Sequence, residues 1–300
     1  MRERALVRDL EQVLEEGGLR GSFLVRDLDS GEELALGPDL PYPTASLVKI
    51  PLALATVERV HEGELDGART VEMVPGRDTV AGPAGLSRFR HRSRVAVEDL
   101  LYLATALSDN TAAQLLFDLT PPERIAEVLR RVGVHGITVR HGIAEVGRTP
   151  MRALDPGDAH LALELAIGAH TEGHGHPVRQ LDVTHASSGS ARAYVDLLQA
   201  LWRPTAVAGP VAAHVRGLMG ANMLRHRLSP DFASDSATWS SKTGTVLNCR
   251  HEIGVVEHAD GQVLAVAALT ESQVPAAAQP GAEALMGRVA RRLHDHLRAW

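Results

Sequence analysis

Hydrophobic residues recur at helical spacing near both ends of the chain. The first set is followed by Gly17-Gly18, which is typical of a helix end. Its members are Leu6, Val7, Leu10, Val13 and Leu14. The second set lies close to the C-terminus and consists of Leu285, Met286, Val289, Leu293 and Leu297. Both patterns predict amphipathic helices, each with one face packed on a core.

Two pairs of short apolar runs predict β-hairpins. Residues 21–27 and 32–36 flank an Asp-Ser-Gly turn, and residues 251–257 and 263–269 flank an Ala-Asp-Gly turn. A further strand is expected at 239–242, just before the second hairpin. Strands and a helix therefore come from each end of the chain.

Residues 46–224 are dominated by helical patterns. We therefore expect an α/β protein of the α+β type, in which an antiparallel sheet is flanked by the terminal helices. Residues 1–45 with 225–300 would form this sheet lobe, and 46–224 an inserted all-helical lobe. A functional site is expected in the cleft between the two.

The bulk composition excludes several classes of function. The chain has 300 residues, of which 44% are hydrophobic and 23% charged, with a net charge of −6. These values are ordinary for a globular protein and indicate neither nucleic-acid nor membrane binding. The start of the chain lacks the apolar core of a secretory signal, and Cys249 is a lone cysteine. We expect a cytoplasmic monomer that acts on a small molecule.

The basic residues are unevenly divided. Of 31 Lys and Arg residues only Lys49 and Lys242 are lysines. Arginine stays protonated, whereas a buried lysine can lose its proton and act as a base. The two lysines therefore indicate positions where this difference matters, although they could also have survived by chance.

Ser46 and Lys49 lie one helical turn apart at the start of an apolar run. A serine hydroxyl becomes a nucleophile when a base takes its proton, and a partly desolvated lysine can be that base. On its own this spacing is weak evidence, because it occurs by accident in chains of this length.

Two further motifs add polar groups. Ser108-Asp109-Asn110 joins two helical patterns; it is either a helix cap or a loop tip that carries a proton relay and an amide for substrate. Lys242-Thr243-Gly244-Thr245 ends a predicted strand; it is either an edge strand or a site where a ligand approaches the backbone at Gly244.

Together the three motifs resemble those of the penicillin-interacting serine enzymes, and most closely class A β-lactamases. The resemblance implies that Ser46 is the acylated nucleophile and that Lys49 is its base or part of a proton network. It places the oxyanion hole at the N–H groups of Ser46 and Thr245. It also makes Ser108 a proton donor to the leaving nitrogen.

The resemblance also assigns substrate-binding residues. Asn110 would hold the side-chain amide of the substrate, while Lys242, Thr243 and Thr245 would bind its carboxylate. Arg250 lies near the position where some class A enzymes keep a carboxylate-binding arginine.

One part of the family pattern is missing. Class A enzymes carry a Glu-x-x-Leu-Asn loop whose glutamate activates the deacylating water. Here Glu145 is followed by Val146-Gly147-Arg148-Thr149, without the Leu and Asn. Glu145 is either this base or a solvated loop carboxylate. The segment 149–190 is longer than the family pattern implies.

No cofactor is expected. His170, His174 and His176 lie in this extra segment, but a Gly- and Pro-bearing loop of this kind is more often solvated than metal-binding. The predicted function is hydrolysis of the β-lactam amide through an acyl-enzyme on Ser46. The alternatives are a cytosolic esterase, amidase or acyl transferase, and a penicillin-binding sensor without turnover.

Overall fold

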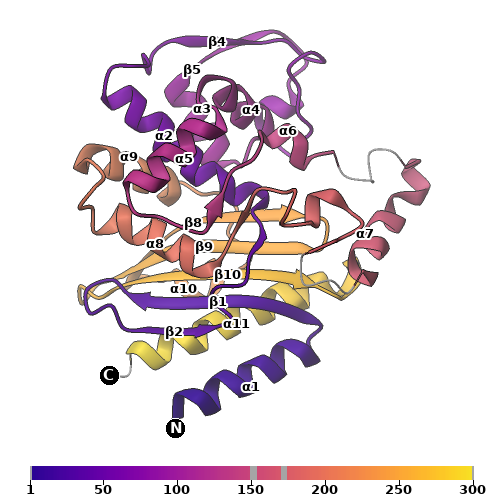
Figure 1. The fold of residues 1–300 in the computed structure, drawn as a ribbon, viewed down its shortest axis with the longest axis vertical. Coiled ribbons are helices and arrows are strands. Elements are labelled where there is room, and N and C mark those ends of the chain that lie inside the picture. Colours follow the sequence, from indigo (N-terminus) through magenta and orange to yellow (C-terminus); the bar gives the residue numbers. More distant parts are fainter. Residues whose placement is uncertain (1, 149–153, 170–173, 299–300) are drawn as a thin grey trace.

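The computed structural model describes residues 2–148, 154–169 and 174–298. A five-stranded antiparallel sheet lies at its centre, in the order β2-β1-β10-β9-β8 (Figure 1). Its strands are β1 (Leu19–Asp27), β2 (Glu33–Leu36), β8 (Ala237–Val246), β9 (Cys249–His258) and β10 (Val263–Ser272). Strand β1 pairs with β10 along its whole length, so the two ends of the chain close one sheet.

The terminal helices α1 (Arg2–Glu16) and α11 (Gln279–Arg298) cover one face of this sheet (Figure 1). Alternate residues of β1 and β10, such as Phe23 and Val266, point into the layer and pack against Leu10 and Leu293. The predicted hairpins and terminal helices are thus present, and the predicted α+β fold is confirmed.

The opposite face of the sheet is covered by α8 (Ala191–Trp202), beyond which several of the other helices pack around α2 (Lys49–His61), whereas the short helix at 229–232 packs against α11. All of α2 from Lys49 to Glu58 is buried. The other helices are α3 (Val97–Ala106), α4 (Asn110–Leu119), α5 (Pro122–Arg131), α6 (Ile143–Val146), α7 (Ala159–Gly168), α9 (Gly209–Gly220) and α10 (Ser229–Phe232).

The region between β2 and β8 is not purely helical. A small sheet of order β3-β7-β6 fastens the chain before Ser46, since Pro43 pairs with Ser188. Its strands are β3 (Tyr42–Pro43), β6 (Ile137–Thr138) and β7 (Ser188–Gly189), and a separate pair joins β4 (Thr70–Met73) to β5 (Ser93–Ala96). The short 3-10 helices are η1 (Ala45–Val48), η2 (Gly85–Arg88), η4 (Pro156–Asp158), η5 (Arg179–Leu181) and η6 (Ala276–Ala278).

Strand β8 runs further than its apolar pattern predicts. It continues to Val246, so Lys242-Thr243-Gly244-Thr245 lies in the last half of the strand and only Val246 follows it. None of the helices that the structure describes is long and apolar enough to cross a bilayer.

Candidate active site

An open pocket of about 400 Å³ lies where η1, the start of α4, helix α6 and the end of β8 meet. Three residues predicted for the site line it from three different elements: Ser46, Asn110 and Thr245. The remaining lining residues are Ala81, Gly82, Pro83, Ile143, Val146, Gly147, Val246 and Leu247. The structure therefore brings the three sequence motifs to one place.

Ser46 lies in the 3-10 turn η1, one turn before the α-helix α2 begins. Ala45 has a φ of 46°, an unfavourable left-handed conformation for a residue with a side chain. A Cβ on Gly244 would lie 3.2 Å from Thr44 O and 3.1 Å from Leu47 Cγ, so glycine lets β8 pack directly on this turn. Gly244 thus meets η1 and not open space for a ligand.

The side chain of Lys49 is fully buried beneath the pocket and reaches the 108–110 motif. Its Nζ donates to Ser108 O at 2.6 Å, to Asn110 Oδ1 at 2.8 Å and to Ser108 Oγ at 3.2 Å. Within the described residues the Ser46 hydroxyl makes no hydrogen bond. No hydrogen bond joins Ser46 to Lys49 in this structure, because Lys49 donates to the neighbouring loop instead.

Ser108 connects the two lysines of the chain. Its hydroxyl accepts from Lys49 Nζ at 3.2 Å and from Lys242 Nζ at 3.0 Å, and Lys242 also donates to Thr243 O. The φ of Ser108 is 57°, again left-handed. Such strain is kept where the surroundings enforce it, often at functional sites.

Burial lowers the pKa of both lysines. Burial, and then the positive charge of Lys242, hold the pKa of Lys49 well below its usual value. Burial, and then the positive charge of Arg227, lower the pKa of Lys242 to about 7. A neutral amine beneath Ser46 could accept the proton of an attacking hydroxyl.

Asp109 fixes the position of the motif. It caps α4 by accepting from Thr111 N and Ala112 N, so the helix-cap reading of this residue is correct. It also accepts from Leu86 N at 2.5 Å and from Ser87 Oγ at 2.8 Å. Ser108 and Asn110 on either side are thereby held against the lysines and the pocket.

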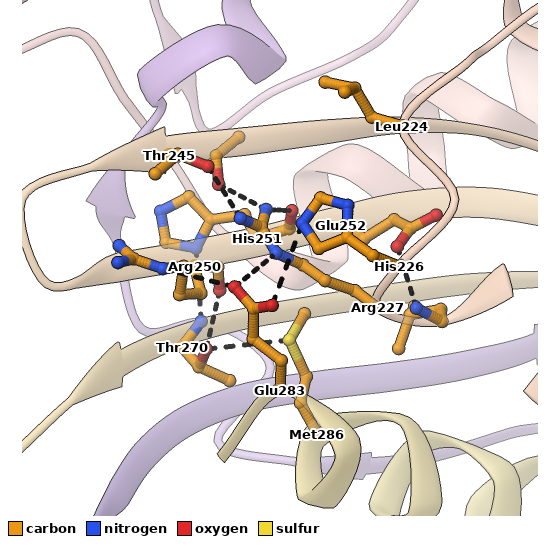
Figure 2. A network of polar contacts seen from close by, with 12 residues as sticks. Leu224, His226, Arg227, Thr245, Arg250, His251, Glu252, Thr270, Glu283 and Met286 are labelled. Atoms are coloured by element: carbon orange, nitrogen blue, oxygen red, sulfur yellow. Dashed lines mark hydrogen bonds and ion pairs between the residues drawn. The ribbon is translucent and has the colours of Figure 1, made fainter. Parts of the chain in front are cut away.

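The motif on β8 is supported from below by Arg227, which sequence reasoning missed. Its guanidinium donates to Gly244 O at 2.8 Å and to Thr245 Oγ1 at 2.7 Å (Figure 2). The same group donates to His251 O and pairs with Glu283. As one of 29 arginines, Arg227 carries no signal in the sequence that distinguishes it.

Arg250 is placed differently from its predicted role. Its Nε lies 3.3 Å from Glu283 Oε1, and its guanidinium also donates to Cys249 O at the β8–β9 turn. It does not line the pocket with Ser46. Thr243 is buried and is not a lining residue either. Arg227 donates to Thr245 Oγ1, and Arg227 and Arg250 both pair with Glu283 (Figure 2).

Glu145 lies on α6 but faces away from Ser46. It pairs with Arg148 at 2.7 Å and lines a separate hollow of about 450 Å³ together with Arg140 and Arg179. Its neighbours Ile143, Val146 and Gly147 face the pocket instead. The structure therefore places Glu145 as a surface carboxylate and not beside the nucleophile.

In the described part of the extra segment, the histidines form no set of metal ligands. His176 is buried and bonds to Val178 N, whereas His174 is exposed; His170 lies outside the described residues. Within those residues no three His, Cys, Asp or Glu side chains are grouped as a metal site. Burial raises the pKa of Cys249, which fits a packing role for this thiol.

Residues 5–297 match the Beta-lactamase enzyme family, Beta-lactamase2. The chain belongs to this family. A curated member of similar sequence is the β-lactamase regulatory protein BlaB of Streptomyces cacaoi, 60% identical over all of both chains.

Solved structures share the fold of this β-lactamase family chain. The β-lactamase of Sphaerobacter thermophilus superposes with a TM-score of 0.75 at 22% identity, covering 95% of each chain. A mutant of PBP-A, solved as its acyl-enzyme complex with penicillin G, gives 0.76 at 19% identity over 99% of this chain and 97% of that one. A class A variant of the ancestral Gram-negative enzyme gives 0.78 at 22% identity over 99% and 100%. The predicted resemblance to class A β-lactamases is confirmed.

Proposed function

We propose that this protein is a penicillin-binding sensor that forms a long-lived acyl adduct with β-lactams on Ser46. The observation that carries the proposal is the composition of the pocket. Ser46 lines the pocket together with Asn110, to which the buried Lys49 donates, but no described residue that lines the pocket is a carboxylate. Among the described residues, the site thus has the groups for acylation but no carboxylate in the pocket to activate the water that would end it.

Acylation can be written with these residues alone. Ser46 Oγ attacks the β-lactam carbonyl carbon while its proton passes to the neutral amine of Lys49. The C–N bond of the lactam breaks, and its nitrogen takes a proton from Ser108, which is replenished by Lys49 at 3.2 Å. Lys242 and Arg227 supply positive charge for the substrate carboxylate beside Thr245.

Release requires a water molecule and a base that activates it. Glu145, predicted from the sequence as that base, is turned to another hollow and bound to Arg148. The name of BlaB of Streptomyces cacaoi as a β-lactamase regulatory protein and the acyl-enzyme complex of the PBP-A mutant agree with a stable adduct. Of the predicted β-lactam hydrolysis, the proposal thus keeps the acylation of Ser46 but not the rapid deacylation.

The test measures adduct formation and release separately. The protein is mixed with penicillin G, and its intact mass is followed before and after free penicillin is removed. We expect one adduct that survives for many minutes, and none with Ser46→Ala. Rapid turnover of a chromogenic cephalosporin would instead favour the hydrolase, and turnover of p-nitrophenyl esters alone the esterase, amidase or acyl transferase.

A carboxylate placed in the pocket provides a stricter test. Val146 lines the pocket on the same short helix as Glu145. Val146→Glu is expected to speed release of the adduct by about tenfold or more, since one general base contributes about this much at the least. Val146→Gln is the matched control. Equal release rates in the two variants would contradict the view that a missing carboxylate limits deacylation.

A further inference from the structure

A strongly basic run lies on the surface, a few residues after the pocket-lining segment 81–83. Residues 88–94 read Arg-Phe-Arg-His-Arg-Ser-Arg, and every member except Ser93 is exposed. Phe89 is 49% exposed, an unusual degree for a large apolar side chain. This segment, from the end of η2 into β5, is called the arginine surface below.

The arginine surface is poorly neutralised by its own protein. Arg92 lies 3.9 Å from Glu72, both of them exposed. Among the described residues, Arg88, Arg90 and Arg94 have no carboxylate within ion-pair distance. The whole chain has a net charge of −6, so this surface is a local reversal of sign. Unpaired positive charge around an exposed aromatic side chain is typical of a recognition surface.

The surface is physically joined to the candidate active site. The preceding loop binds Asp109 through Leu86 N and Ser87 Oγ, at 2.5 and 2.8 Å. Asn110 donates from Nδ2 to Ala81 O at 2.7 Å, while its Oδ1 accepts from Lys49. A ligand that takes over the Asn110 amide must break or shift these bonds.

We propose that the arginine surface docks an acidic segment of a partner protein, and that occupation of the Ser46 pocket alters this docking. The docking itself follows from the surface, whereas the coupling rests on the proposed sensor function. Four arginines can pair with an acidic peptide, and Phe89 supplies an apolar anchor.

The remaining charge distribution favours a protein over a nucleic acid. Nucleic-acid binding domains usually carry an excess of positive charge that follows the long phosphate backbone. Here the rest of the chain is acidic and would repel a long polyanion beyond the four arginines. A short acidic segment would contact only the arginine surface and would therefore not be repelled by the acidic remainder of the chain.

The test uses the full chain and a fluorescein-labelled peptide rich in Asp and Glu with a central Leu, followed by fluorescence anisotropy. Arg90→Glu/Arg92→Glu is expected to weaken binding by about tenfold or more. Arg4→Glu/Arg8→Glu makes the same change of charge on α1, at the opposite end of the molecule (Figure 1), and should leave the affinity within about twofold. Phe89→Ala should weaken binding without reducing its salt dependence.

The results test the docking surface and its coupling to the Ser46 pocket separately. Equal losses in the two double variants, or no binding of the peptide, would overturn the docking surface. Tighter binding of single-stranded DNA than of the peptide would replace the acidic protein segment by a nucleic acid. The experiment is repeated with penicillin-acylated protein, where an unchanged affinity would overturn the coupling. Failure of penicillin to label Ser46 concerns the proposed function only, since the peptide assay needs no adduct.

Discussion

The function of single residues here depends on protonation. Lys49 is fully buried with a lowered pKa, and no arginine could take its place as a base. Lys49→Arg is therefore expected to slow adduct formation with penicillin G by about a thousandfold, as when a general base is lost. Intact-mass kinetics measure this rate, and circular dichroism checks the fold. A folded variant that reacts at a rate close to wild type would show that Lys49 is not the base.

Arg227 is predicted to matter for stability as well as for the pocket. Its guanidinium donates to Gly244 O, His251 O and Thr245 Oγ1 while only 3% exposed. Arg227→Ala removes these donors and should lower the free energy of unfolding by about 3 kcal/mol. Arg250→Ala leaves the pair between Arg227 and Glu283 intact and should cost less. Urea unfolding compares them; a larger loss for Arg250→Ala would contradict the ranking.

The sequence was informative about Ser46, Lys49 and Lys242 because lysine is rare in this chain, and about Ser108 and Asn110 because of their spacing. It was silent on Arg227, which is hidden among 28 other arginines. It also could not fix where Lys49 points. That direction is set by acceptors of the 108–110 loop, which lie far away in the sequence.

At the scale of elements, long periodic segments were predicted well and short ones were not. The terminal helices and the two hairpins follow from apolar periodicity. Strands β3, β6 and β7 have two residues each and therefore no period to detect. The 3-10 turn at Ser46 has a helical apolar pattern, so only the backbone shows that α2 begins later, at Lys49.

The first residue of η2 offers a prediction about how this turn positions the cap of α4. Gly85 has a φ of +68°, and a Cβ there would lie 2.2 Å from Asp109 Oδ2. Gly85→Ala should displace the cap of α4 and slow acylation of Ser46 by about tenfold or more. Gly76→Ala is the control, since its φ is +84° but nothing lies within 4 Å.

Both substitutions carry the backbone cost of a left-handed residue, about 1 kcal/mol. Only Gly85→Ala adds a collision with the motif. Adduct formation and thermal unfolding are measured for each variant. Similar acylation rates in the two variants would mean that Asp109 and the loop do not hold the site in position.

At the scale of the whole molecule, the pocket exists only because distant segments meet. Ser46 follows the first strands of the sheet, Thr245 lies on the strand at its edge, and Asn110 starts a helix between them in the sequence. Spacing along the chain indicated that Glu145 could join them. Its direction depends on how α6 packs, which places Ile143 inward and Glu145 toward Arg148.

A buried histidine in the central sheet also makes the stability of the fold sensitive to acid. His251 is fully buried on β9, where its Nε2 lies 2.9 Å from Pro43 O and its Nδ1 accepts from Thr270 N. Burial, and then the charge of Arg227, lower the pKa of His251 to about 3 from an ordinary value of 6.5. Above pH 6.5 neither the folded nor the unfolded chain binds this proton. Below it, only the unfolded chain does, so stability falls as the pH falls.

One such histidine changes the free energy of unfolding by about 1.4 kcal/mol per pH unit between its two pKa values. His251→Gln keeps an amide that can donate to Pro43 O but cannot gain the proton. Urea unfolding of both proteins, between about pH 6 and pH 4, should give the variant a slope that is shallower by this amount. His294, whose pKa burial lowers to about 4, is present in both proteins and cancels in the comparison. Equal slopes of the free energy of unfolding against pH would show that protonation of other groups destabilises the fold in acid. The contact of His251 with Pro43, before Ser46, would then not explain the loss of stability.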